Sequence, residues 1–149
     1  MHKSDYEFAA YPAERPKRDV FKAMLRGALG RCPACGAGRL NRRYLKANDH
    51  CPACGEALHH HRADDAPPYF TIFIAGHLLV PVQLALETAF RPALWVHAAI
   101  GAPLAIGLCL ALLPAVKGAI IGLQWALYMH GFDPDAADDA GLAKVEGLG

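Results

Sequence analysis

Charged side chains are scarce and unevenly placed in this sequence of 149 residues. Only 19% of the residues are Asp, Glu, Lys or Arg, against roughly 25% in an average soluble domain, and 54% are hydrophobic. Residues 1–66 hold 12 of the 15 basic residues against 8 acidic residues, whereas residues 67–149 hold 3 basic and 6 acidic residues. This pattern excludes a uniformly basic protein that coats nucleic acid, and intrinsic disorder over most of the chain. A membrane protein is the first class to consider.

Cysteine is also sparse, and several signatures of secretion and catalysis are missing. Five cysteines are too few for a disulfide-rich secreted domain. No signal peptide opens the chain: residues 1–18 are polar and interrupted by proline, so we expect a flexible leader that stays in the cytoplasm. The sequence shows no paired carboxylates, no nucleophile beside a base and no phosphate-binding glycine loop. We therefore expect that the protein is not an enzyme.

Four of the five cysteines form two matching CPACG knuckles. Cys32 and Cys35 belong to the first knuckle and Cys51 and Cys54 to the second, with fifteen residues between the two pairs. This spacing predicts a zinc ribbon over residues 31–62. Four thiolates would close the coordination shell of one structural zinc ion and leave no position for a substrate. Iron is the alternative occupant, because four thiolates suit it too.

Basic side chains lie between the two knuckles. Arg42 and Arg43 flank Tyr44 in this loop and could contact nucleic acid or anionic lipid. A solvated ribbon loop is the simpler interpretation, so we do not expect nucleic acid as the main partner. Three consecutive histidines, residues 59–61, follow the second knuckle, but the four cysteines already satisfy the ion.

A short basic amphipathic helix is predicted before the ribbon, over residues 19–30. Its apolar and basic side chains fall on different faces at helical spacing, and Asp19 stands in the N-cap position. Such a helix could lie on an anionic membrane surface or dock on the neighbouring ribbon. The pattern leaves both arrangements open.

Two long apolar runs without any Asp, Glu, Lys or Arg follow the ribbon. They contain 18 residues, over 69–86, and 23 residues, over 94–116. At about 1.5 Å per residue the second run is long enough to cross a hydrocarbon core of roughly 30 Å, and the first is at the lower limit. A soluble helix pair would need polar outer faces, which neither run has. We therefore predict a transmembrane hairpin over residues 67–116, with helices at about 69–88 and 93–114.

The basic residues predict the orientation of this hairpin. Twelve of them precede the first run, one lies in the connecting loop and two follow the second run. Because cytoplasmic segments carry the excess of Lys and Arg, we expect both termini in the cytoplasm. Residues 131–149 are predicted as an acidic tail.

Residues 117–130 are again apolar but too few to span a membrane, and they predict a separate helix at the cytoplasmic interface. Lys117 and Gln124 share one face of this helix and, with Trp125, are candidate interaction residues. Small residues at four-residue spacing from Gly118 would permit close contact with another helix.

Ionisable residues also occur inside the predicted spans. His77 lies within the first span and is a candidate for function, because ionisable groups are costly in a membrane. It could be a single haem or metal ligand, or it could form a neutral hydrogen bond to a group such as Gln83. His97 lies about 12 Å away in depth, too far for both histidines to share one ion. We expect Glu87 to pair with Arg91 across one helical turn.

The order of these pieces resembles the bacterial membrane family catalogued as domain of unknown function 983. The resemblance covers about residues 25–129 and rests on the two CPxCG knuckles, Pro68-Tyr69-Phe70, Gly76-His77, Leu113-Pro114, Lys117-Gly118 and Gln124-Trp125. Members of the family are often encoded among genes for cytochrome c oxidase and its assembly factors. The resemblance therefore implies an accessory or assembly role beside a haem–copper oxidase.

The sequence thus predicts a small zinc ribbon on an all-α two-helix transmembrane hairpin, with short interfacial amphipathic helices. We expect a non-catalytic accessory whose ribbon is a cytoplasmic interaction module. Its partners would be the lipid bilayer and a membrane protein such as a cytochrome c oxidase subunit or assembly factor. Two alternatives are a haem or metal handling protein that uses His77, and a membrane-tethered nucleic-acid-binding module that uses Arg42 and Arg43.

Overall fold

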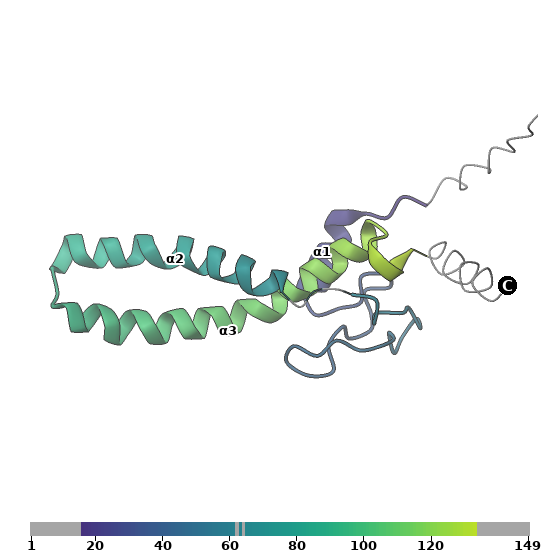
Figure 1. Ribbon diagram of the computed structural model, residues 1–149, viewed down its shortest axis with the longest axis horizontal. Coiled ribbons are helices and arrows are strands. Elements are labelled where there is room, and N and C mark those ends of the chain that lie inside the picture. The colour runs from purple at the N-terminus through teal and green to yellow at the C-terminus, as the bar shows by residue number, and fades with distance from the viewer. Residues whose placement is uncertain (1–15, 62, 64, 134–149) are drawn as a thin grey trace, which may run out of the picture.

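The computed structural model describes residues 16–61, 63 and 65–133. The predicted leader and acidic tail therefore lie almost entirely outside the described residues. The described helices, in chain order, are α1 (Val20–Ala28), α2 (Ala66–Phe90), α3 (Leu94–Ala126) and the short 3-10 helix η1 (His130–Phe132). Helices α2 and α3 run side by side as a long hairpin, and α1 packs against the C-terminal end of α3 (Figure 1).

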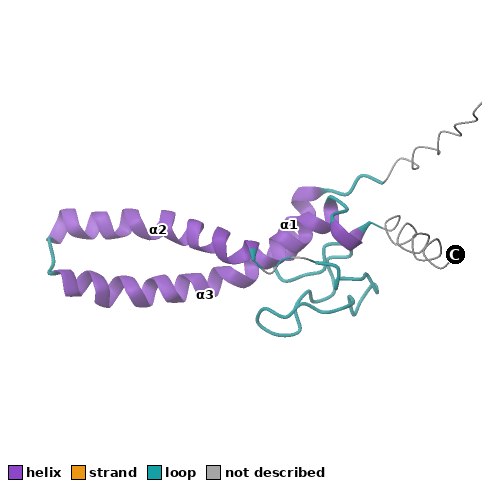
Figure 2. Ribbon diagram, in the orientation of Figure 1, coloured by secondary structure: helices purple, strands orange, loops and turns teal. Residues whose placement is uncertain are grey.

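Residues 30–61, here called the cysteine unit, lie between α1 and the hairpin in the chain. They contain no regular strands. The backbone pairs at isolated bridges, Arg31 with Arg39, Asn41 with Ala47 and His50 with Ala57. Figure 2 shows this segment as loops gathered beside the end of α3. Where the sequence predicts a zinc ribbon over residues 31–62, the described residues thus form loops with short bridges in place of strands.

The hairpin has the length and composition that the apolar runs predict. Helices α2 and α3 have 25 and 33 residues, and both are long and apolar enough to cross a membrane. In each, only 11% of the most apolar window is buried within the chain. Most of the apolar surface of the hairpin therefore faces outward, which suits lipid or another membrane protein.

Helix α3 extends beyond the predicted end of the second span, which corrects the prediction of a separate helix over 117–130. It continues through Pro103 and Pro114 to Ala126 without a break. Each of these prolines removes one backbone hydrogen bond from the helix, and α3 nevertheless continues through both. With 33 residues α3 is about 50 Å long, well beyond a hydrocarbon core of roughly 30 Å. The last turns of α3, residues 117–126, lie beyond the apolar run of residues 94–116 and are here called the platform.

Close packing of small residues joins α1 to this platform. Gly27 of α1 faces Gly118 of α3 so closely that a Cβ atom on either glycine would overlap the carbonyl group of the other. One turn further along, Gly122 makes the same kind of approach to the carbonyl of Ala23. The two helices therefore run in opposite directions at a separation that only small side chains allow.

The large apolar side chains of α1 point away from this contact. Phe21, Leu25 and Leu29 are 77%, 51% and 67% exposed, whereas Ala23 and Gly27 are buried. The side chain of Asp19 accepts a hydrogen bond of 2.9 Å from the backbone N–H of Lys22, as the predicted N-cap requires. The predicted basic helix is present, but it buries its small residues on α3 and leaves its apolar stripe uncovered.

Candidate metal centre

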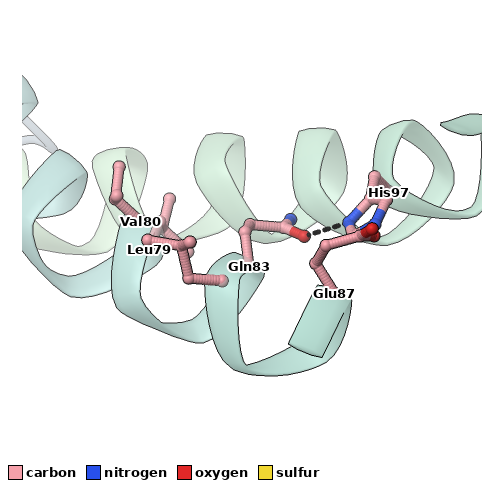
Figure 3. A pocket seen from close by; sticks show the side chains of 6 residues that line it. Leu79, Val80, Gln83, Glu87 and His97 are labelled. Carbon is pink, nitrogen blue, oxygen red and sulfur yellow. Dashed lines mark hydrogen bonds and ion pairs between the residues drawn. The ribbon is translucent and has the colours of Figure 1, made fainter. Parts of the chain in front are cut away.

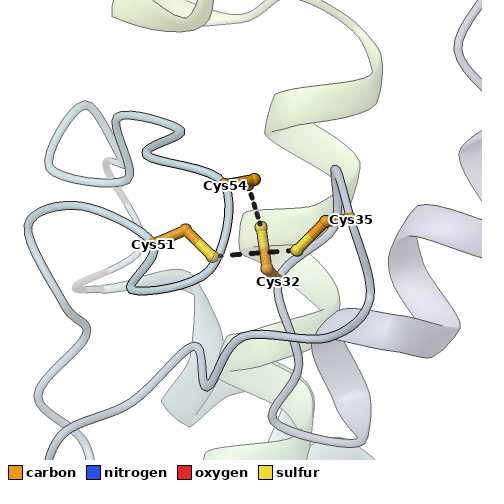
Figure 4. Close-up of side chains that lie close together, drawn as sticks. All are labelled: Cys32, Cys35, Cys51 and Cys54. Carbon is orange, nitrogen blue, oxygen red and sulfur yellow. Dashed lines mark hydrogen bonds between the residues drawn. The ribbon is translucent and has the colours of Figure 1, made fainter.

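The four cysteines of the two knuckles come together in space. Their Sγ atoms all lie within 4.8 Å of one another. The Sγ atoms of Cys32 and Cys54 are 3.8 Å apart, and so are those of Cys35 and Cys51 (Figure 4). A tetrahedral zinc ion with bonds of about 2.3 Å holds its sulfur ligands about 3.8 Å apart. The cluster therefore fits one tetrahedral metal ion, as the spacing predicts.

Each knuckle is built by the same tight turn. The N–H of Gly36 donates to the carbonyl of Cys32 at 2.8 Å, and the N–H of Gly55 donates to the carbonyl of Cys51 at 2.9 Å. Both glycines have positive φ angles, 73° and 77°, a conformation that residues with a side chain rarely adopt. The CPACG repeat therefore encodes the local geometry directly.

Backbone N–H groups and burial tune the four thiols in opposite directions. Hydrogen bonds from the backbone of Gly38 and Ala37 lower the pKa of Cys35 to about 6, which favours its thiolate form. Burial raises the pKa of Cys32 and of Cys54. Since metal binding requires thiolates, these two residues must release protons when an ion enters, and affinity for the ion rises with pH.

Gly38 is a residue of the site that the spacing does not reveal. It is buried, and a Cβ atom there would overlap the Sγ atom of Cys51. Its carbonyl also accepts a hydrogen bond of 2.8 Å from the N–H of Cys32. A glycine lying outside the CPxCG pattern thus lets one knuckle approach the other, and only the folded arrangement identifies it.

The cysteine unit shares its hydrophobic core with the end of α3. Leu40 and Leu58 from the unit and Ile121 from α3 are completely buried, and Phe132 of η1 joins the same cluster. Arg26 of α1 donates hydrogen bonds to the carbonyls of the first knuckle at Pro33 and Ala34, at 3.0 and 2.8 Å. The cysteine cluster is therefore fixed to both α1 and α3.

One of the candidate interaction residues, Trp125, takes part in this attachment. The indole N–H of Trp125 donates to the carboxylate of Glu56 at 2.8 Å, across the boundary between α3 and the cysteine unit. The guanidinium of Arg18 lies 4.1 Å from the Trp125 ring centroid and donates to its carbonyl. Gln124 is 94% buried beside it, whereas Lys117 is half-buried at the base of the unit. An external role for these side chains stays a prediction.

The predicted basic loop residues Arg42 and Arg43 are both exposed. The loop turns back through a hydrogen bond of 2.9 Å from the N–H of Arg42 to the carbonyl of Lys46. At its tip the hydroxyl of Tyr44 donates to the carbonyl of Leu110 in α3. The basic loop therefore contacts α3 of the hairpin through Tyr44.

The polar groups of the hairpin pair differently from the prediction. Oε1 of Gln83 accepts a hydrogen bond of 2.9 Å from Nδ1 of His97, and the carboxylate of Glu87 lies 2.9 Å from Nε2 of the same ring (Figure 3). Gln83 is therefore not a partner of His77. The predicted ion pair of Glu87 with Arg91 is also wrong: the carboxylate of Glu87 contacts His97, and Arg91 ends α2 in a left-handed conformation with φ of 42°. The ring of His97 instead joins the two helices near the tip of the hairpin.

His77 belongs neither to the cysteine cluster nor to the group formed by Gln83, Glu87 and His97. Its Nδ1 forms a hydrogen bond of 2.8 Å with the carbonyl of Phe73, one turn earlier in the same helix. The side chain lines a shallow, mostly apolar pocket of about 450 Å³ on the outer surface of α2.

Comparison with known proteins gives one match. The family described as "Protein of unknown function (DUF983)" matches residues 41–125, more than half of the chain. The matched region contains the second knuckle, nearly all of α3 and the whole of α2. No curated protein and no solved structure matches the chain.

Proposed function

The chain belongs to the DUF983 family of proteins of unknown function, and we propose that it is a non-catalytic accessory or assembly protein of the bacterial inner membrane. In this proposal α2 and α3 span the membrane with both termini in the cytoplasm. The cysteine unit is a zinc ribbon that contacts a partner at the membrane surface. The partner implied by the family resemblance is a subunit or assembly factor of cytochrome c oxidase.

The sulfur geometry supports a structural role for the metal. Four thiolates at tetrahedral separations leave no position for a substrate or a reactive water molecule. The unit also has few large buried side chains of its own, since Leu40 and Leu58 complete their core with Ile121 of α3. A zinc ion would supply the stability that so small a core lacks, and would hold the unit rigid against the helices.

The uncovered stripe on α1 is the observation that favours a protein partner. Phe21, Leu25 and Leu29 form one exposed apolar face on a helix that packs on the part of α3 beyond its apolar run. Contiguous apolar surface of this kind marks interaction sites in folded proteins. A partner that has both a membrane domain and a cytoplasmic face would cover this stripe together with one side of the hairpin.

Site-specific photo-crosslinking from position 21 tests the proposal. We expect a photo-reactive residue in place of Phe21 to crosslink a membrane-embedded oxidase subunit or assembly factor in native membranes. The matched control is the same residue in place of Lys22, which is exposed on a different face of α1. Equal crosslinking from both positions, or crosslinking to lipid alone, would contradict a protein partner on this face.

A second function, haem or metal handling, is favoured by one observation at His77. When Nδ1 of a neutral histidine donates to a backbone carbonyl, the lone pair of Nε2 is set up to bind a metal. Nδ1 of His77 has this contact with Phe73, and the side chain is exposed on the outer surface of α2.

A further inference from the structure

A basic pocket lies between the cysteine unit and α3. It has a volume of about 500 Å³, and among the described residues that line it the charged ones are Arg43, Lys46, Lys117 and Asp49. Tyr44 and Leu45 add apolar surface to the wall, and His61 completes the rim. Among these described residues basic side chains outnumber the acidic one by three to one, which favours an anionic ligand.

The position of the pocket along α3 places it at the edge of the proposed span. Lys117 is the first charged residue after the uncharged run of residues 94–116. Tyr44, from the opposite wall, donates to the carbonyl of Leu110. That carbonyl lies seven residues before Lys117, about 10 Å nearer the middle of α3. The basic loop therefore reaches along the apolar part of the helix, with Arg43 and Lys46 beside the tip.

We propose that this pocket binds the phosphate group of an anionic phospholipid of the cytoplasmic leaflet, an inference that rests on the proposed insertion of α2 and α3. The planar guanidinium of Arg43 suits two oxygens of one phosphate, and the lysines add point charges. Tyr44 and Leu45 would contact the glycerol and the start of the acyl chains, which leave the pocket along the apolar surface of α3.

The same placement argues against nucleic acid as the ligand of this loop. Arg43 follows Arg42 directly, so both lie within two residues of the side chain that touches α3. A bilayer around the hairpin would cover this part of α3 and leave too little room for a duplex. Basic pockets at the cytoplasmic ends of membrane helices are instead typical sites for lipid headgroups.

Native mass spectrometry of the full-length protein in detergent tests the proposal. We expect one molecule of phosphatidylglycerol to be retained in preference to phosphatidylcholine. Arg43→Gln and Lys117→Gln should each lower the apparent affinity for phosphatidylglycerol about fivefold, and the double variant roughly twentyfold. The control variant Lys22→Gln removes the same charge from α1, away from the pocket, and should leave the affinity unchanged. Metal content measured in each variant shows whether the cysteine unit is still folded.

Three results would overturn the lipid site. Equal losses in Lys22→Gln and Arg43→Gln would show general surface charge, and displacement of the lipid by inorganic phosphate at equal concentration would show a site for free phosphate. Displacement by an oligonucleotide would show a nucleic-acid site. Alkaline extraction of native membranes separates these results from failure of the proposed function. A chain released by alkali is not inserted, whereas a retained chain without lipid preference contradicts the lipid site alone.

Discussion

Cys51→Ser should release the metal and unfold the cysteine unit while the hairpin stays helical. Cys51 is buried, and its Sγ lies 3.8 Å from that of Cys35, so its loss opens the four-thiolate shell. Structural zinc contributes on the order of 10 kcal/mol to the folding of such small units, more than the shared core around Leu40 and Ile121 can replace. Zinc analysis and hydrogen exchange of residues 30–61 would measure the two effects.

The fifth cysteine provides the matched control for this experiment. Cys109 lies in the middle of α3, apart from the cluster, and is half-buried. Cys109→Ser should therefore keep the full metal content and the full protection of the cysteine unit. A Cys51→Ser protein that still holds one zinc per chain would contradict the four-cysteine site.

Gly118→Val should separate α1 from α3 and loosen the whole platform. Any Cβ at this position overlaps the carbonyl of Gly27, a backbone atom that cannot move without displacing α1. We expect a loss of about 3 kcal/mol in the stability of the platform. The loss would be measured as a lower midpoint of thermal unfolding and faster proteolysis of α1.

Gly107→Val is the control on the same helix, because nothing lies within 4 Å of a Cβ atom at that position. It should leave the unfolding midpoint nearly unchanged. If the two valine variants are equally stable, the close packing of α1 on α3 is not a source of stability.

Features fixed by neighbouring residues could be predicted from the sequence. The CPACG knuckles bring their cysteines together because each turn is closed by its own backbone hydrogen bond and glycine. Helices α2 and α3 follow from the length of two uncharged runs. The N-cap at Asp19 is equally local, since its partner is the N–H three residues later.

Features that depend on contacts between residues far apart in the chain could not be predicted from the sequence. The continuation of α3 beyond Pro114 accompanies the packing of Gly118 on Gly27, and no local signal specifies that pairing. The partner of Gln83 depends on the relative rotation of two helices, which places His97 opposite it. The attachment of the cysteine unit to α3 likewise rests on contacts such as that of Trp125 with Glu56, which are 69 residues apart.

The measurement that tests the central claim most directly is purification of the tagged chain from its native membranes in mild detergent. Bound subunits, metal and haem would be read from the same sample, for the wild-type chain and for His77→Ala. The accessory role predicts oxidase subunits or assembly factors in stoichiometric amounts with one zinc per chain, unchanged in His77→Ala. Haem or a second metal without oxidase partners, lost in His77→Ala, would contradict that role and identify haem or metal handling as the function.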